Sequence, residues 1–444
     1  MSMLRSGSYE QLAVITPDIV NNEIGIVRNL AEVPREPDAP EFFHFGAQAC
    51  NTRAFTRYEN FAIAGGAGIT REQAAAKSIG EAVERYSSAI YDFQELPLAS
   101  FEDAGMECVS PEEFVTYAPE QYEESGFIYV PFERSAPIRW TAATDLASGK
   151  TVHVPAAMVY MPYIYYRGTG DSPIVQPISS GLAAHLAPGP AAISAICEVV
   201  ERDAFMINWQ AMMAMPQIRT ETLSDENFDR VARFDRTGHQ VTLFDLTMPE
   251  GIPVIMAVAR HPASSAPALV FAAACDPSPE AAVRKALDEL AHTRRYMQQI
   301  KRDFPRLVPE PGHGNVTDQP THLNFWVDHA NAHLANFTFQ SKKRIDFQSI
   351  PDLSTGNPDS DVRALVDQLS AAGYRVLIAE LTTPDVAEYG FVVLKAVIPG
   401  MHPLQMGYRY RSLGGRRLWE APAKLGQRGI RKETGDNPSP HPFP

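Results

Sequence analysis

The segment SSGLAAHLAPGPAAISAICEVVERDAFMINW, residues 179–209, decides the fold that we predict for this chain. The Gly-Pro pair at 189–190 indicates a helix start, because proline is favoured in the first turn of a helix. Apolar residues then recur at helical spacing, which predicts an amphipathic helix. Glu198, Glu201 and Arg202 stand at i, i+3 and i+4, so we expect them to project from one face of it.

Two further segments share this design: GGAGITREQAAAKSIGEAVERYSSAI, residues 65–90, and DPSPEAAVRKALDELAHTRRYMQQI, residues 276–300. In the first, Thr70 and Gln73 have the spacing of a capping box, in which two side chains satisfy the free amides of a helix start. In the second, Ser278 is the expected N-cap residue. Both segments are therefore predicted to be helices with apolar stripes.

Each of the two helices also carries acidic and basic side chains. In the helix at 65–90, Glu81, Glu84 and Arg85 repeat the spacing of Glu198, Glu201 and Arg202. Glu289 and Arg294 lie in the helix at 276–300. Carboxylates drawn from separate helices would repel one another unless a cation neutralised them. Magnesium suits this role, since it binds oxygen ligands and bridges carboxylates to nucleotide phosphates. The arginines would hold phosphate oxygens by forked hydrogen bonds.

Other interpretations stay open for these residues. Each Glu–Arg set could be a solvated helix face whose ion pairs contribute only tenths of a kcal/mol. No Walker A motif is present, which disfavours a P-loop nucleotide fold. The GGAG sequence at 65–68 is expected to form a turn that could approach phosphate. His185 and His292 lie near the acidic helices and are expected to be packing residues rather than catalytic bases.

Strand-forming runs separate the helices. They are rich in β-branched and aromatic residues and lie at 152–166, 239–246, 253–259 and 267–274, with helix–strand pairs at 360–381 and 390–400. A long surface loop is expected at 304–322, where proline and glycine recur. Alternating helices and strands predict a mixed α+β fold in which helices pack on large β-sheets.

The composition excludes several classes of protein. A net charge of −14 argues against nucleic acid or an anionic membrane as a partner. No apolar run approaches the roughly 20 residues that span a bilayer, and the start lacks the apolar core of a signal peptide. The four cysteines are scattered, which disfavours a zinc site or a disulfide framework: Cys50, Cys108, Cys197 and Cys275. We expect a soluble, cytoplasmic protein with reduced thiols.

The last part of the chain has an unusual composition. It is locally basic, through Arg416, Arg417, Lys424, Arg428, Arg431 and Lys432, and then reads NPSPHPFP. Pro440, Pro442 and Pro444 stand at alternate positions. Such a segment is either a disordered tail or an extended, stiff end that threads into a cleft at little cost in entropy. In the second case the terminal carboxylate of Pro444 could serve as an acid or base.

Together these segments resemble the YcaO family. GITREQAAAKSIGEAVERY is similar to its first ATP-binding motif, SSGLAAHLAPGPAAISAICEVVERDAF to the second and AVRKALDELAHTRRY to the third. LTTPDVAEYGFVVLKAVIPGMHPL and LGGRRL resemble the C-terminal half of the family. The final PHPFP resembles the PxPxP ending of its azoline-forming members. The resemblance covers most of the chain from about residue 60.

The resemblance implies a nucleotide fold without a P-loop, in which Mg²⁺ ions bridge helix carboxylates to ATP. The implied Mg²⁺ ligands are Glu81, Glu84, Glu198, Glu201 and Glu289. The implied ATP contacts are Arg85, Arg202, Arg294, Ser180, Glu84 and Glu201. The implied catalytic group is the Pro444 carboxylate, presented by Pro440 and Pro442. The domains implied are a lead-in at 1–60, a catalytic domain at 61–410 and the Pro-rich tail at 411–444.

The chain also departs from the pattern that most family members share. Ala67 stands where a lysine is common, Lys77 where a serine is common, His185 where a glycine is frequent and His292 where a glutamine is frequent. These differences affect individual nucleotide contacts and leave the expected fold intact.

The family resemblance implies ATP-dependent cyclodehydration of Cys, Ser or Thr in a ribosomal precursor peptide, giving thiazoline or oxazoline rings. It also implies a separate E1-like partner that binds the leader peptide, an FMN-dependent azoline dehydrogenase as a companion, and a homodimer within a larger complex. The alternatives are formation of a thioamide or amidine, a non-catalytic ATP-binding scaffold, and an ordinary acidic protein with surface Glu–Arg pairs.

Overall fold

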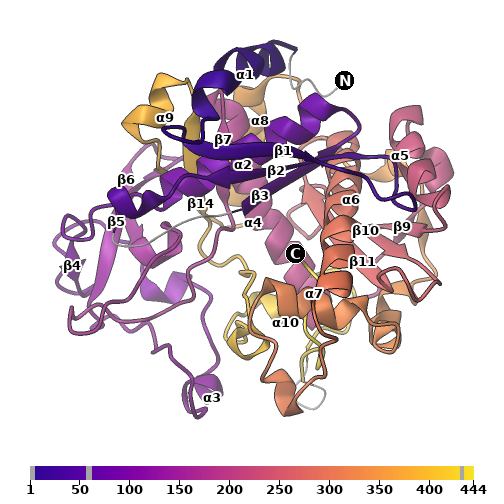
Figure 1. Cartoon of the computed structure of the whole chain (residues 1–444). Coiled ribbons are helices and arrows are strands. Elements are labelled where there is room, and N and C mark those ends of the chain that lie inside the picture. The colour runs from indigo at the N-terminus through magenta and orange to yellow at the C-terminus, as the bar shows by residue number, and fades with distance from the viewer. Residues whose placement is uncertain (1–5, 57–62, 431–434) are drawn as a thin grey trace.

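A first sheet of three antiparallel strands forms the upper part of the molecule (Figure 1). The computed structural model describes residues 6–56, 63–430 and 435–444. The strands are β1 (Val27–Val33), β2 (Phe43–Ala49) and β3 (Ile63–Gly68), in the order β1-β2-β3. Helix α2 (Arg71–Ser88) packs against β2 and β3, and α1 (Ser6–Ile19) contacts α2. The expected domain boundary at residue 60, and the basic residues Arg431 and Lys432, lie outside the described residues.

The second sheet joins segments that are far apart in the chain. Its order is β4-β5-β13-β14-β7, and β6 pairs with β5. The strands are β4 (Leu98–Ala99), β5 (Ile138–Asp145), β6 (Thr151–Pro155), β7 (Leu182–His185), β13 (Leu377–Glu380) and β14 (Val392–Val397). Helix α4 (Pro188–Gln210) packs on β14 and β7, and α2 also contacts β7. Helix α2 therefore lies between the first and the second sheet.

The third sheet packs against α6 (Pro279–Asp303), the last of the three predicted acidic helices, through its strands β10 and β11. Its order is β11-β10-β9-β8-β12, formed by β8 (Gln217–Ile218), β9 (Gln240–Asp245), β10 (Val254–Arg260), β11 (Leu269–Cys275) and β12 (Arg344–Ile345). The other helices are α3 (Pro119–Tyr122), α5 (Asp225–Asp235), α7 (Gln319–Val327), α8 (Pro358–Ala371), α9 (Pro384–Glu388) and α10 (Arg417–Lys424). This mixed architecture confirms the predicted α+β fold.

The predicted helix starts are confirmed, with one detail missing. The Thr70 side chain accepts a hydrogen bond from the Gln73 amide, and Ser278 accepts one from the Ala281 amide. Helix α4 begins at Pro188. The reciprocal bond of a capping box is absent from α2, because Gln73 Oε1 has no partner among the described residues. These caps satisfy amides that a helix start would otherwise leave free.

The prediction of a turn at GGAG is wrong. Residues 65–68 belong to strand β3, which pairs with β2 in antiparallel register. Glycine is needed here because two neighbours lie directly on the strand. A Cβ on Gly65 would stand 2.2 Å from Cε1 of His292, and one on Gly66 would stand 2.4 Å from the carbonyl oxygen of Ala74. The glycines thus allow α2 and α6 to approach the first sheet closely.

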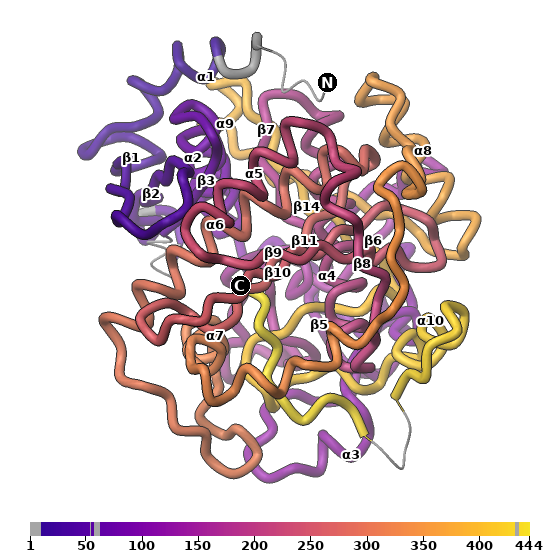
Figure 2. The backbone as a smooth tube through the Cα atoms, turned by 90° about the vertical axis from the view of Figure 1, so that its right-hand side faces the viewer, coloured from indigo at the N-terminus to yellow at the C-terminus, as the bar shows by residue number. Residues whose placement is uncertain are grey.

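Helix α4 lies at the centre of the molecule, as the tube drawn in Figure 2 shows. Most of its residues are buried, and Phe205 and Trp209 are among the largest buried side chains. Its apolar stripe belongs to the main core, together with β10, β11 and α6. An acidic side chain on this helix is therefore held close to the interior. Among residues 6–56, 63–430 and 435–444, no helix is long and apolar enough to cross a membrane.

The last described segment of the Pro-rich tail, residues 435–444, threads into the interior, with its end near α4 (Figure 1). The indole nitrogen of Trp209 donates to the Ser439 carbonyl at 3.1 Å, and that of Trp326 donates to the Pro440 carbonyl at 2.9 Å. Phe443 is fully buried, and its ring centre lies 4.3 Å from that of Phe205. Of the two alternatives for this segment, the threaded tail is the one observed.

Candidate active site

Helices α2, α4 and α6 bring their acidic faces into one electrostatic cluster. Burial raises the pKa of Glu84 well above its usual value, and the charges of Glu198 and Glu81 add to that shift. Burial likewise raises the pKa of Glu201 to about 7, with Glu198 and Glu289 adding to the shift. The five glutamates expected from the sequence thus act on one another across three helices. We call them the carboxylate cluster.

Two arginines lie within the carboxylate cluster. Nη2 of Arg85 stands 3.4 Å from Oε1 of Glu81, and its Nη1 stands 3.9 Å from Oε1 of Glu84. Nη2 of Arg202 stands 3.3 Å from Oε1 of Glu198, and its Nη1 pairs with Glu201. These side chains are only partly exposed, between 12% and 34%. They are therefore not the solvated Glu–Arg pairs of an ordinary helix face.

Backbone amides orient two of the glutamates. The Gly65 amide donates to Oε2 of Glu81 at 2.8 Å, and the Cys275 amide donates to Oε2 of Glu201 at 3.2 Å. These donors stand on β3 and at the end of β11, so the first and third sheets each fix one carboxylate. Hydrogen bonds of this kind favour the charged form of a carboxylate.

Lys395 is a member of the site that our sequence reasoning missed. It lies on β14, is 2% exposed, and its Nζ donates to the carbonyls of Ile178 at 2.9 Å and Ser180 at 2.6 Å. Burial lowers its pKa to about 7, and the charges of Glu198 and Glu84 oppose that shift. The signal was a single lysine inside the apolar run VVLKAV, since a buried lysine needs partners.

Ser180 is held against this lysine by a glycine that follows it. Gly181 has a φ of +88°, and a Cβ there would stand 2.5 Å from the Ala396 carbonyl oxygen. The backbone of the segment from Ile178 to Gly181 therefore lies directly on β14. This places Ser180 beside Lys395. The contact of Ser180 with the nucleotide stays a prediction.

Arg294 is not brought to the carboxylate cluster by any described contact. It is 1% exposed, its Nη1 stands 3.3 Å from Oε2 of Glu36, and its Nε donates to Nε2 of His239 at 3.4 Å. Arg294 on α6 thus points toward Glu36, in the segment between β1 and β2. Its role as a phosphate contact stays a prediction.

The donor set fits magnesium. Within the described parts of the chain, no three His, Cys, Asp or Glu side chains already stand close enough to hold a metal ion. However, the carboxylate cluster offers only oxygen ligands, which Mg²⁺ prefers. Burial holds the pKa of Glu84 and of Glu201 above the usual value. A divalent cation would offset this cost by pairing with the ionised form.

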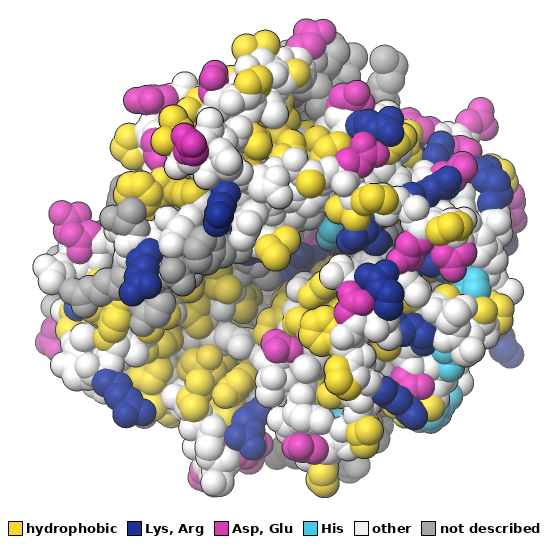
Figure 3. Space-filling model, viewed as in Figure 1, with side chains coloured by type: hydrophobic (Ala, Val, Ile, Leu, Met, Phe, Trp, Pro, Cys, Tyr) yellow, Lys and Arg dark blue, Asp and Glu magenta, His cyan; other side chains and the backbone are white. Residues whose placement is uncertain are grey.

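The threaded tail ends beside the carboxylate cluster. The guanidinium carbon of Arg202 stands 4.4 Å from the ring centre of Phe443, a cation–π contact. Phe443 lies between Pro442 and Pro444, and Pro444 is partly exposed. The face drawn in Figure 3 is hollowed between the first sheet and the lower half of the molecule. The end of the tail and the acidic helices are therefore neighbours.

A second buried ionic network lies behind the cluster. Arg417 of α10 donates to Oδ1 of Asp203 and to both carboxylate oxygens of Glu250, each at 2.6 Å. The hydroxyl of Tyr374 also accepts from Arg417 at 2.6 Å. Asp203 follows Arg202 on α4 and accepts the His402 amide at 2.7 Å. This network fixes the second half of α4 against the chain that follows β14.

Acidic faces of three helices around central arginines, without a P-loop, are the arrangement expected of a protein that binds magnesium and a nucleotide through helix side chains. Residues 65–402 match the family described as YcaO cyclodehydratase, ATP- and Mg²⁺-binding. The chain belongs to the YcaO family. ATP and Mg²⁺ are therefore its cofactors, as predicted from the motifs.

Solved structures share the fold. A heterocyclase in complex with substrate and cofactor superposes with a TM-score of 0.81 at 21% identity, over 98% of this chain and 57% of the heterocyclase. YcaO from Methanopyrus kandleri, bound with AMPPCP and Mg²⁺, superposes with a TM-score of 0.65 at 19% identity, over 88% of this chain and 90% of that one. The chain thus spans little more than half of the heterocyclase.

A curated relative shares sequence over most of its length. An uncharacterized protein of Methanothermobacter thermautotrophicus is 26% identical over 365 residues, which cover 79% of this chain and 85% of the relative. This match adds no activity.

Proposed function

We propose that this protein catalyses the ATP- and Mg²⁺-dependent cyclodehydration of Cys, Ser or Thr residues in a ribosomal precursor peptide. One observation supports the proposal most directly: the ring of Phe443, the residue before Pro444, lies on Arg202 of the carboxylate cluster. A phosphoryl-transfer site and a candidate proton-transfer group therefore share one place in the fold. The likeness to a heterocyclase in complex with substrate and cofactor supports the same reaction class.

In this reaction the peptide thiol or hydroxyl gives up its proton to a base and adds to the preceding amide carbonyl, which forms the new ring bond. The carbonyl oxygen takes the terminal phosphoryl group of ATP, which leaves ADP. The bond from carbon to that oxygen then breaks, phosphate departs, and the amide nitrogen loses its proton to form the C=N bond. Phosphorylation is needed because an amide oxygen is otherwise a very poor leaving group.

The roles that we propose follow the geometry of the carboxylate cluster. The Mg²⁺ ligands are Glu81, Glu84, Glu198, Glu201 and Glu289. Magnesium would stabilise negative charge on the phosphoryl group. Arg85 and Arg202 would hold phosphate oxygens, since each guanidinium already faces the glutamates. Ser180 and Lys395 border the same site and would contact the nucleotide.

The terminal carboxylate of Pro444 is our candidate for proton transfer to and from the peptide. Pro440 and Pro442 keep the tail extended, so the end is presented with little loss of entropy. We expect one residue appended after Pro444 to abolish cyclisation while nucleotide binding is retained. Peptide mass spectrometry and ATP binding by calorimetry would check this. Unchanged turnover in the extended protein would refute the role.

The substrate is expected to reach this protein through a partner. We propose that a separate E1-like protein binds the leader peptide and that an FMN-dependent dehydrogenase oxidises the rings afterwards. We place the reaction in the cytoplasm and expect a homodimer within the complex.

The direct test is the intact mass of the precursor peptide after incubation with this protein, its partner and Mg-ATP. We expect the loss of one water per modified residue, dependent on ATP and abolished by Glu201→Gln. Glu72→Gln is the matched control, because Glu72 is exposed in the first turn of α2. Exchange of oxygen for sulfur would instead identify thioamide formation. Tight ATP binding without any mass change, with the partner present, would indicate a scaffold.

A further inference from the structure

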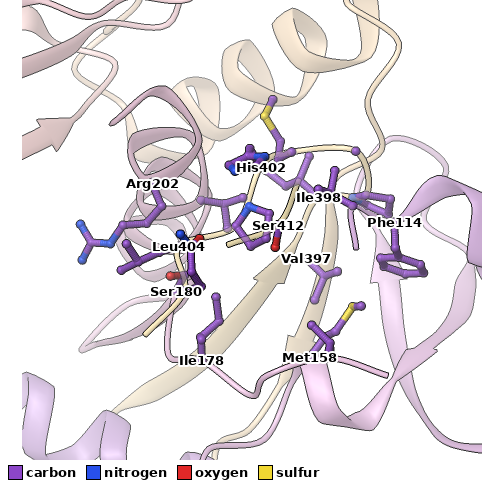
Figure 4. A pocket seen from close by; sticks show the side chains of 18 of the residues that line it. Phe114, Met158, Ile178, Ser180, Arg202, Val397, Ile398, His402, Leu404 and Ser412 are labelled. Atoms are coloured by element: carbon purple, nitrogen blue, oxygen red, sulfur yellow. The ribbon is translucent and has the colours of Figure 1, made fainter. Parts of the chain in front are cut away.

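A pocket adjoins the carboxylate cluster and shares Ser180, Lys395 and Arg202 with it (Figure 4). Its cavity volume is about 100 Å³, which is smaller than the usual site for a whole small molecule. Its walls are mostly apolar and come from Phe114, Met158, Ile178, Val397, Ile398 and Leu404. Figure 4 shows the guanidinium of Arg202 pointing away from the middle of the pocket. The interior is therefore apolar, although charged residues stand at its edge.

Two buried polar side chains line this pocket without partners. His402 is 1% exposed, and neither of its ring nitrogens has a hydrogen-bond partner among the described residues. Gln405 is 3% exposed, and its Oε1 also has no partner there. An unsatisfied buried polar group costs about 1–3 kcal/mol. Native proteins rarely retain such groups unless a ligand or water completes them.

The pocket also touches the tail and the network behind the site. The Gln405 carbonyl interacts with Nε2 of His441 at 2.8 Å, and His441 precedes Pro442 and Phe443. The backbone of His402 is fixed by Asp203, which Arg417 holds in turn. The pocket thus lies between the carboxylate cluster and the segment that presents Pro444. A peptide that reacts at the cluster would pass this pocket.

The lining narrows the choice of ligand. It includes no Asp or Glu, so a cationic group would find no countercharge and would meet Lys395. The two cations of the lining, Lys395 and Arg202, stand on the side of the carboxylate cluster, where we propose that they contact the nucleotide, so the rest of the pocket offers no cation to an anionic group. An apolar side chain is favoured by each square ångström of apolar surface that it buries. Burial lowers the pKa of His402 to about 3, so its imidazole is neutral and offers one donor and one acceptor.

We propose that this pocket binds an apolar side chain of the precursor peptide next to the residue that cyclises, while His402 and Gln405 hydrogen-bond the peptide backbone beside it. The inference rests on the proposed function and adds the sequence preference of its substrate. A precursor with Leu, Ile, Val, Met or Phe beside the reactive Cys, Ser or Thr is then the preferred substrate.

The test uses the full chain with its partner and a set of precursor peptides that differ only in the residue preceding the reactive Cys, or following it. At one of these two positions we expect kcat/KM of the peptide with Leu to exceed that of the peptide with Gly by about 30-fold, since each buried methylene favours binding. Met158→Ala enlarges the pocket and should shift the ratio of Trp to Leu peptides by about tenfold. Met212→Ala is the control, because Met212 is 40% exposed and does not line the pocket.

The outcomes separate the two proposals. Equal processing of all peptides would overturn the pocket assignment and leave cyclodehydration intact. A Met158→Ala protein whose KM for ATP rises, with no change in peptide preference, would assign the pocket to the nucleotide instead. His402→Phe should raise the peptide KM about tenfold at an unchanged ATP KM. No product from any peptide would overturn the proposed function, and this inference with it.

Discussion

Burial changes the charge behaviour of two side chains in the carboxylate cluster. Glu201 has its pKa raised to about 7, and Lys395 has its pKa lowered to about 7. In water a glutamate and a lysine are both fully charged at neutral pH. Here each changes its charge close to neutrality. The site is therefore sensitive to pH and to the charge of whatever it binds.

The proposed role of Glu201 as a Mg²⁺ ligand predicts how magnesium binding depends on pH. Without a cation its carboxyl is protonated below about pH 7, and Mg²⁺ must then displace that proton. We expect the apparent Mg²⁺ affinity to fall up to about tenfold per pH unit below 7. Calorimetric titration of Mg-ATP at pH 6 and pH 8 measures this fall, and Glu201→Gln should remove it. An affinity that does not change with pH would contradict this assignment.

The same shift affects stability. Because the folded pKa of Glu201 lies above its ordinary value of 4.5, the stabilising effect of its proton is complete below pH 4.5. That effect is lost as the pH rises through 7. Magnesium pairs with the ionised carboxylate, so the increase in Tm caused by Mg²⁺ should be larger at pH 8 than at pH 6.

Lys395→Met tests the lysine at the edge of the cluster. The substitution keeps an unbranched side chain but leaves the Ile178 and Ser180 carbonyls without their donor. It also removes a cation that faces Glu84 and Glu198. We expect ATP hydrolysis to fall by about a hundredfold, the usual effect of losing one charge-stabilising group.

Steady-state ATPase assays measure that fall, with Lys150→Met as the control on an exposed turn. Circular dichroism would confirm that the variant is folded. Full activity in a folded Lys395→Met protein would remove Lys395 from the site.

At the scale of the helices, the sequence could predict one part of the candidate site and not another. Helical spacing located Glu81, Glu84, Glu198 and Glu201, because two turns of a helix fix which side chains share a face. It could not decide which side of α6 faces the site. That orientation depends on packing against the third sheet, which turns Arg294 toward Glu36. Lys395 was missed for the same reason, since its neighbours come from α2, α4 and the segment before β7.

Trp326→Phe tests how the tail is anchored. The indole nitrogen of Trp326 donates to the buried Pro440 carbonyl, and phenylalanine cannot replace that bond. An unsatisfied buried carbonyl should lower the free energy of unfolding by about 1–3 kcal/mol. Urea denaturation measures the change.

Trp419→Phe is the matched control, because Trp419 is 42% exposed on α10. We expect it to change the unfolding free energy by less than about 0.5 kcal/mol. Equal effects of the two substitutions would show that the indole bond does not anchor the tail.

The whole molecule is held together around α4 by buried charges as well as by its core. Arg417 joins Asp203 of α4 to Glu250, which lies between β9 and β10. The fold class followed from alternating helices and strands, but this network did not. The pairing of β14 with β7 and of β13 with β5 joins segments about 200 residues apart, which local patterns leave undetermined.

Arg417→Met tests this network. It would leave Asp203 and Glu250 buried without their cation, and breaking a buried ion pair costs about 3–5 kcal/mol. We expect a loss of that size in chemical denaturation. Arg416→Met is the control, since Arg416 is exposed beside it. A loss no larger than that of the control would mean that the network contributes little to stability.

The three acidic helices stand on three different sheets, and this has a consequence for how such a site can be moved between proteins. A P-loop is one continuous stretch, so a recombination event or a designer can transplant it whole. Here α2 ends at Ser88, whereas α6 begins at Pro279, and strands on both sides of α4 orient them. No single fragment carries the site. Transfer of the site to another protein therefore requires all three sheets. Chimeras that exchange one sheet for that of a distant homologue should lose nucleotide binding even when they fold.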